Sequence, residues 1–176
     1  GRDADARVFQ AAVRSADASG ARAASGAVGR LNPKKPKTGS YPFLFDERIS
    51  STRVGHLLAA VNGAMVARGS SWLRDALGEE VLPKHLSIVE DPHRPRTSAS
   101  RPFDAEGLPT APRHIVRNGV LEGWTLDLAN ARKLGMNSTA NAARGTGSPP
   151  SPSRRHHPLT PGTPTPRPPP RDQRPR

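Results

Sequence analysis

The chain has 176 residues, of which 27 are Lys or Arg and 15 are Asp or Glu, so its formal net charge is +12. It contains no cysteine, which excludes a disulfide framework and a thiolate metal site. No stretch approaches the roughly 20 apolar residues that span a bilayer, and the charged residues 1–10 do not resemble a signal peptide. We therefore expect a soluble, cytoplasmic protein with no membrane partner.

Prolines and positive charge are concentrated at the C-terminal end. Residues 149–176 hold 11 of the 20 prolines and six arginines, against one acid. Such a segment cannot bury enough apolar surface to offset the entropy of ordering it, so we predict a disordered Pro/Arg-rich tail. The chain has only four Phe, two Trp and one Tyr, few rings for base stacking. Nucleic acid is therefore not the expected partner.

The part before the tail divides into a short N-terminal piece and one domain. Residues 1–30 are predicted as a partial helical remnant, and 31–148 as the folded domain. In the remnant, a short helix can present one apolar face, and later glycines weaken its continuation. That face would consist of Val8, Phe9, Ala12 and Val13. Residues 32–40, rich in proline and lysine, predict a loop.

The domain begins with an expected strand followed by an expected helix. The apolar run 41–45 is typical of a strand. The hydroxyl side chains at 50–52 can cap a helix over 52–68, which would end at Gly69. Its apolar residues recur at helical spacing and predict one buried stripe. They are Val54, Leu57, Leu58, Val61 and Met65. A second short helix is predicted over 70–77.

The second half of the domain predicts antiparallel strands. A strand is expected over 86–89, followed by a long loop over 90–113. The strongest local pattern is 114–124, where Asn118 and Gly119 supply the two positive-φ positions of a hairpin turn. Asp127 can cap a helix over 128–134. The predicted fold class is α+β, with antiparallel strands and a few short helices.

Four blocks of the sequence resemble one protein family. They are LNPKKPKTGSYPFLFDERISS (31–51), GHLLAAVNGAMVARGSSWL (55–73), EDPHRPR (90–96) and RPFDAEGLPTAPRHIVRNGVLEGWTLDLANARKLGMNSTANAARG (101–145). They occur in one order and resemble the TldD/PmbA family, long called modulator of DNA gyrase, on its PmbA (TldE) side. The resemblance covers about 31–152. It implies the C-terminal part of a longer protein.

The resemblance implies a role in proteolysis. TldD and PmbA form a paired complex in the bacterial cytoplasm that degrades peptides and unfolded polypeptides. The TldD subunit holds zinc on an HExxxH helix, whereas PmbA lacks that motif. The implied partner of this chain is therefore a TldD-like subunit, which would carry the zinc.

The segment that matches the zinc helix has lost most of its ligands. Ser51 and Thr52 stand where the first His and the Glu would be, so only His56 remains. Glu47 lies nine residues before His56, which on one helix is roughly 13 Å of rise and half a turn out of phase. We therefore expect no metal and no catalytic residue in this chain. His56 is expected to be partly buried beside the apolar stripe.

Five residues are candidates for the surface that faces a substrate. They are Glu47, His56, His93, Asp104 and Glu106. His93 is expected to belong to a rigid hydrogen-bonded loop. Asp104 and Glu106 are two residues apart, so an extended chain would point both carboxylates the same way and allow cation binding or acid/base chemistry. We nevertheless favour a structural or substrate-cleft role for this pair over a chemical one.

The sequence leaves the family pattern after Pro152, with a partial return at 159–166. Arg- and Pro-rich text of this kind is what an out-of-frame reading of GC-rich DNA produces. A frameshift or truncation would remove a strand and leave an unpaired sheet edge. Three functions stay open: a subunit of a TldD-type peptidase without its own zinc, a metallopeptidase in its own right, and a basic nucleic-acid-binding or gyrase-modulating protein.

Overall fold

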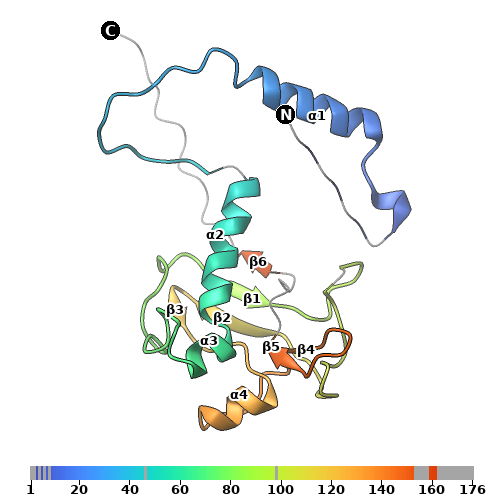
Figure 1. Ribbon diagram of the computed structural model, residues 1–176, viewed down its shortest axis with the longest axis vertical. Coiled ribbons are helices and arrows are strands. Elements are labelled where there is room, and N and C mark those ends of the chain that lie inside the picture. Colours follow the sequence, from blue (N-terminus) through green and yellow to red (C-terminus); the bar gives the residue numbers. More distant parts are fainter. Residues whose placement is uncertain are drawn as a thin grey trace.

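Short antiparallel strands and short helices make up the folded part of the chain, as the α+β prediction required (Figure 1). The structure is a computed structural model, and it describes residues 3, 5, 7, 9–45, 47–97, 99–152 and 159–161. The side chains of residues 47, 48 and 159–161 lie outside that description, as does most of the Pro/Arg-rich tail.

The elements follow one another in a simple order. The helices are η1, a 3-10 turn (Gln10–Ala12), α1 (Ala16–Val28), α2 (Glu47–Ala60), α3 (Gly63–Ala67) and α4 (Leu128–Lys133). The strands are β1 (Ile88–Glu90), β2 (Arg113–Arg117), β3 (Val120–Leu121), β4 (Ala142–Ala143), β5 (Ser151–Pro152) and β6 (Leu159–Pro161).

The main sheet has the order β3-β2-β1-β6, and each neighbouring pair is antiparallel. The predicted hairpin is confirmed: Asn118 (φ 48°) and Gly119 (φ 84°) form its turn between β2 and β3. Its second strand is shorter than predicted and ends at Leu121. The strand predicted over 86–89 is β1, which begins two residues later and runs to Glu90.

The helix predicted over 52–68 is two helices, and it starts earlier than expected. The α2 helix begins at Glu47, so the hydroxyl residues at 50–52 lie inside it rather than capping it. It ends at Ala60 because Val61 and Gly63 exchange backbone hydrogen bonds with Thr125 instead of continuing the helix. Asn62 then caps α3, its side chain accepting from the Ala64 amide.

The hydrophobic core lies between α2, α3 and the sheet. The predicted apolar stripe is confirmed for four of its five residues: Leu57 and Val61 are buried, and Val54 and Leu58 pack against them. Met65 lies on α3 instead and is only partly buried. The sheet contributes Ile115, Val116 and Leu121, which are all but inaccessible. Every buried apolar residue of the described chain is at position 57 or later. The first half of α2 therefore stands outside the core (Figure 1).

The helix predicted over 70–77 is wrong, because this segment consists of turns. The Ser71 hydroxyl donates to the Ala60 carbonyl at the end of α2 and accepts from the Leu73 amide, 3.0 Å away. The following residues then bond to the hairpin: Gly78 N–H donates to Leu121 O at 2.8 Å. Long-range contacts to α2 and β3 thus replace a local helical turn.

The predicted helix after Asp127 is confirmed as α4. The Asp127 side chain accepts from the Asn130 amide, and this carboxylate is 1% exposed. Gly135 (φ 66°) ends the helix, with Met136 N–H bonded to Ala131 O. This is the Schellman arrangement that glycine favours after a helix.

The N-terminal arm, defined here as residues 9–45, differs from the prediction. The 13-residue α1 runs through Gly20 and Gly26, although glycine weakens helices, and the Ser15 side chain caps it. The expected helix around Phe9 is the 3-10 turn η1, and Val8 lies outside the described residues. The loop predicted over 32–40 is confirmed. No residue of α1 is buried, and α1 lies apart from the sheet (Figure 1).

The strand predicted over 41–45 is wrong, because those residues form neither strand nor helix. A strand needs a neighbour for its backbone groups, and among the described residues neither sheet includes this segment.

The expected unpaired sheet edge is also wrong. Strand β6 pairs with β1 along Ile88–Glu90 and occupies the edge beside it. The remaining residues of the predicted tail after Pro152 lie outside the described residues. Within the described residues, no helix has both the length and the apolar character needed to cross a bilayer.

Candidate functional site

A polar loop region over 90–113 holds three of the five predicted site residues. It runs from the end of β1 to the start of β2 and contacts residues 139–142. Its turns are held by side-chain hydrogen bonds to backbone groups, such as Thr97 Oγ1 to Arg94 O at 2.8 Å. The loop is therefore fixed over most of its length by its own polar residues.

His93 belongs to a hydrogen-bonded loop, as predicted. Its amide donates to Asp91 Oδ1 at 3.1 Å, and its Nε2 lies 3.1 Å from Thr110 Oγ1. The Thr110 hydroxyl in turn donates to the carbonyl of Arg101 at 2.6 Å. Although its ring is exposed, His93 thus helps to join the two ends of the loop.

Asp104 and Glu106 do not point the same way, because the chain turns between them. Asp104 is 3% exposed, and its Oδ1 accepts from the amides of Glu106 (2.9 Å) and Leu108 (3.0 Å). Its Oδ2 accepts from Ala142 N–H at 3.0 Å. Glu106 Oε2 instead accepts from Leu128 N–H at the start of α4, at 2.9 Å. Each carboxylate binds backbone amides, so the pair does not form an acid/base site.

The expected partial burial of His56 is wrong. The ring is exposed, because the core face of α2 is the one that carries Leu57 and Val61. Glu47 starts the same helix, and its side chain lies outside the described residues. In the described part of the chain, His56 has no hydrogen bond with His93, Asp104 or Glu106.

The structure contains a buried charged cluster that no sequence pattern predicted. Arg113 Nε donates to Glu90 Oε2 at 2.8 Å, and its Nη2 donates to Asn141 Oδ1 at 2.9 Å. Asn141 Nδ2 donates back to Glu90 Oε1 at 2.6 Å, and Thr139 Oγ1 donates to Asn141 Oδ1 at 2.8 Å. Glu90 is 2% and Asn141 1% exposed. The four residues lie up to 51 positions apart, and the β1–β2 register pairs only Glu90 with Arg113, so local sequence gives no sign of the cluster.

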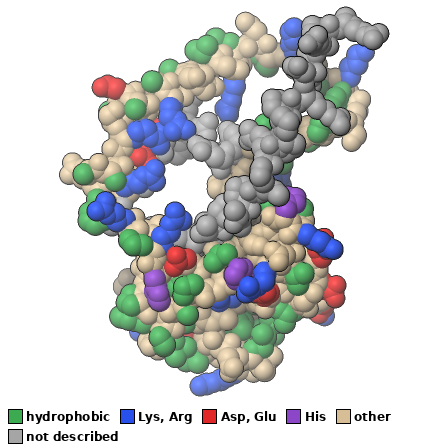
Figure 2. Space-filling view, turned by 180° about the vertical axis from the view of Figure 1, so that it is seen from behind, with side chains coloured by type: hydrophobic (Ala, Val, Ile, Leu, Met, Phe, Trp, Pro, Cys, Tyr) green, Lys and Arg blue, Asp and Glu red, His purple; other side chains and the backbone are tan. Residues whose placement is uncertain are grey.

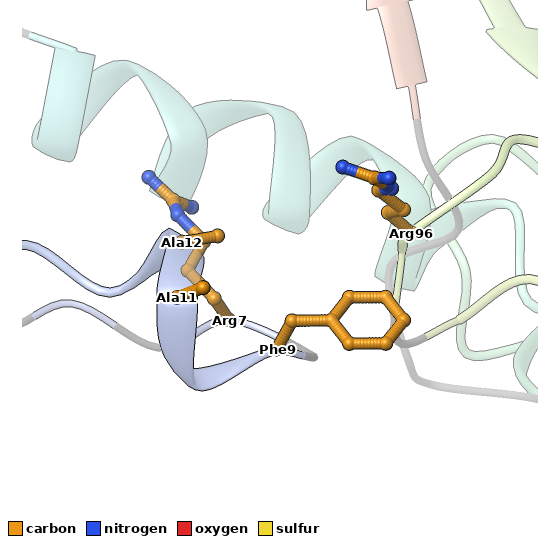
Figure 3. Close-up of a pocket in the computed structure, with 5 residues that line it drawn as sticks. All are labelled: Arg7, Phe9, Ala11, Ala12 and Arg96. Atoms are coloured by element: carbon orange, nitrogen blue, oxygen red, sulfur yellow. The ribbon is translucent and has the colours of Figure 1, made fainter.

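Two cavities lie elsewhere in the described molecule. One, of about 160 Å³, is lined by Arg7, Phe9, Ala11, Ala12 and Arg96. Figure 3 shows the Phe9 ring directed toward Arg96, whose guanidinium carbon lies 5.7 Å from the ring centre. The other, of about 310 Å³, lies between α3 and α4 and is lined by Ala64, Ala67, Arg68, Asn130 and Lys133. Neither cavity includes one of the five predicted site residues.

Among the residues that the structure describes, no set of donor groups is arranged to hold a zinc ion. Zinc needs three or four protein ligands that converge on one point. Across the described residues, no three His, Asp or Glu side chains lie close enough to share an ion. The buried carboxylates already accept hydrogen bonds: Asp104 and Asp127 from amides, Glu90 from Arg113 and Asn141.

Comparison with known proteins identifies a related family. The model for the PmbA/TldA metallopeptidase C-terminal domain matches residues 38–168. The match continues past Pro152, where we had expected the family pattern to end apart from a partial return over 159–166.

Individual relatives agree with that match. The chain is 42% identical over 123 residues to the metalloprotease PmbA of Escherichia coli O157:H7, covering 70% of this chain and 27% of that protein. It is 31% identical over 91 residues to a TldD homologue of Haemophilus influenzae, covering 52% and 18%. The chain thus spans about a quarter of the length of the PmbA protein it matches.

A solved structure has the same fold. A proposed modulator of a DNA gyrase from Thermotoga maritima superposes with a TM-score of 0.71 at 29% identity, covering 86% of this chain and 36% of that one. TldE from Thermococcus kodakarensis gives a TM-score of 0.52 at 26% identity, covering 60% and 24%.

Proposed function

The chain belongs to the PmbA/TldA metallopeptidase family, and from this premise we propose that it acts as a PmbA-like subunit of a TldD-type metallopeptidase. In this proposal the chain has no zinc of its own, and a TldD-like partner supplies the metal. The complex acts in the bacterial cytoplasm on peptides and unfolded polypeptides. This chain contributes surface and stability to the assembly and no group to the chemical step.

The observation that carries the proposal is the composition of α2. By the family resemblance, Ser51 and Thr52 stand where a zinc helix of the TldD type would have His and Glu, and His56 is the only imidazole of α2. A hydroxyl pair is a poor substitute, because zinc in peptidases is bound by imidazole and carboxylate groups. A single exposed imidazole cannot hold the ion with useful affinity.

The loop over 90–113 also supports the proposal that this chain is a subunit without catalytic groups. The carboxylate oxygens of Asp104 and Glu106 accept hydrogen bonds from backbone amides, and these bonds fix the loop against α4 and residue 142. A carboxylate used in this way is poorly available as a general base. In this proposal the loop instead forms a rigid surface next to a site that another subunit completes.

In the part of the molecule that the structure describes, basic side chains are not confined to one place. Figure 2 shows Lys and Arg both along the arm and on the body. A nucleic-acid site usually gathers such charges in one stripe with aromatic rings among them. This distribution favours the peptidase subunit over the nucleic-acid-binding alternative.

Reconstitution tests the proposal. The chain alone is expected to hydrolyse no peptide, and a TldD-like subunit from the same cell should co-purify with it and bring zinc-dependent peptidase activity. The variant E106Q should keep that activity, since its amide oxygen can still accept from Leu128 N–H and the Glu106 carboxylate does not act in the chemical step. Peptide hydrolysis by the chain alone, or failure of the TldD-like subunit to bind it, would contradict the proposal.

A further inference from the structure

The larger of the two cavities lies between α3 and α4, which pack against each other in the body of the molecule (Figure 1). Gly63 lets the start of α3 approach the chain before α4, because a Cβ there would lie 2.5 Å from the Leu126 side chain. Ala64 and Ala67 follow on the same helix and line the cavity with methyl groups. These small side chains leave about 310 Å³ between the two helices, more than a single small ion fills.

Two positively charged side chains line this cavity, one from each helix. Arg68 is the C-cap of α3, and Lys133 is the last residue of α4. None of the five lining residues is acidic. Among the described residues, neither Arg68 nor Lys133 forms an ion pair, in contrast to four other cations of the body: Arg74, Lys84, Arg113 and Arg117. Within the described part of the chain, the cavity therefore has two positive charges and no counter-charge.

Most of the hydrogen-bonding capacity at the cavity is unused within the described residues. Arg68 Nη2 donates to Met65 Sδ at 2.8 Å, its only described side-chain partner. A thioether sulfur is a weak acceptor, and a guanidinium has five N–H donors. Asn130 donates one Nδ2 hydrogen to Asp127 Oδ1 at 2.7 Å, which leaves its other amide hydrogen and its amide oxygen without a described partner. The cavity thus offers several donors and one amide acceptor to a ligand.

The position of the two cations at helix ends explains only part of this arrangement. Carbonyl groups at the C-terminal end of a helix favour a nearby cation. Arg132 meets that preference on α4 as well as Lys133 does, because both lie in its last turn, but Arg132 does not line the cavity. Comparison of these two neighbours therefore separates a general effect of helix-end charge from a charge directed at a ligand.

From this arrangement we propose that the cavity binds the C-terminal carboxylate of a short peptide. Arg68 and Lys133 bind the carboxylate with charge-assisted hydrogen bonds. Asn130 meets the adjacent peptide group, and the methyl groups of Ala64 and Ala67 contact the terminal side chain. A carboxylate fits better than a phosphate, because the carbonyl ends of the two helices oppose a second negative charge. The site needs neither zinc nor a TldD-like subunit, so it goes beyond the proposed function and does not rest on it.

Nuclear magnetic resonance of the full, nitrogen-15-labelled chain tests the proposal with tri-alanine as the probe. Tri-alanine should shift the backbone amide signals of Ala64, Ala67 and Asn130 with a Kd on the order of 1 mM, since exposed ion pairs contribute little each. Tri-alanine with an amidated C-terminus lacks the carboxylate and should bind roughly tenfold more weakly. Inorganic phosphate should also bind more weakly than tri-alanine.

Matched variants assign the binding to this cavity. R68Q and K133Q should each weaken tri-alanine binding roughly fivefold. R132Q removes the same charge from the same end of α4 and should leave binding unchanged. All three positions are exposed, so thermal unfolding should stay that of the parent. A67L keeps every charge but occupies part of the cavity, and it should weaken binding as well.

Several results would overturn the proposal. Tri-alanine could shift no signal at about 20 mM, far above the expected Kd. Its amidated form or inorganic phosphate could bind as tightly as tri-alanine does, which would exclude the peptide carboxylate as the ligand. R132Q could weaken binding as much as K133Q, or A67L could leave it unchanged, and either outcome would place the interaction outside the cavity.

Discussion

Replacement of Arg113 by methionine is expected to lower the free energy of unfolding by about 3–5 kcal/mol. The Arg113 guanidinium donates to Glu90 and to Asn141, and the Glu90 side chain is almost fully buried. Without Arg113, the Glu90 carboxylate loses this ion pair while staying out of water, and it keeps the hydrogen bond from Asn141. Breaking a buried ion pair by removing one side costs far more than the pair itself contributes.

The double variant E90M/R113M provides the control. It removes both charges, so it should recover much of the stability that R113M alone loses. Urea unfolding monitored by the fluorescence of Trp124, which is buried, would measure all three proteins. A single variant that unfolds at the same urea concentration as the parent would show that the cluster does not hold β1 against β2.

Replacement of Gly119 by alanine is expected to cost about 3 kcal/mol, the second large effect. Gly119 has φ 84°, and a Cβ there would lie 2.3 Å from the carbonyl oxygen of Leu82. That region cannot move away freely, because Val81 and Leu82 both donate to the Gly119 carbonyl, at 2.8 and 3.1 Å. The substitution therefore combines backbone strain with a clash against main chain.

Gly107 gives a matched comparison. It has a similar φ of 80°, but no atom lies within 4 Å of the position a Cβ would take. G107A should therefore cost only the strain, about 1 kcal/mol. Thermal unfolding of the two variants separates the two contributions. Equal losses in G107A and G119A would contradict the close packing of residues 81–82 on the hairpin turn.

The parts of the fold that the sequence predicted are those decided by neighbouring residues. The Asn118-Gly119 turn needs positive φ at both positions, and the capping Asp127 and the final Gly135 define α4 by themselves. The stripe on α2 was also predicted, because helical spacing of apolar residues does not depend on the partner they meet.

The parts that could not be predicted are decided by residues far apart in the chain. The helix breaks at Val61 because Thr125 pairs there, and the turns over 70–77 bond to Ala60 and to β3. The segment over 41–45 has a local strand preference, but no strand forms without a neighbour to receive its amides.

The candidate site divides in the same way. The composition of the segment around His93 was enough to predict a hydrogen-bonded loop. The chain turns between Asp104 and Glu106, so their carboxylates bind different backbone amides, and this turn could not be predicted. The cluster of Glu90, Arg113 and Asn141 depends on the pairing of β1 with β2 and on side-chain hydrogen bonds from a distant loop, which no local pattern predicts. Burial of His56 was misjudged because one residue along a helix changes the face by about 100°.

The zinc content of the purified chain tests the central claim most directly. Measured by plasma mass spectrometry after exposure to zinc and gel filtration, the chain alone should retain far less than one zinc per molecule. Its complex with a TldD-like subunit should retain zinc in proportion to that subunit, and H56A should change neither value. One zinc per molecule of the isolated chain, lost in H56A, would contradict the account and make this chain a metallopeptidase in its own right.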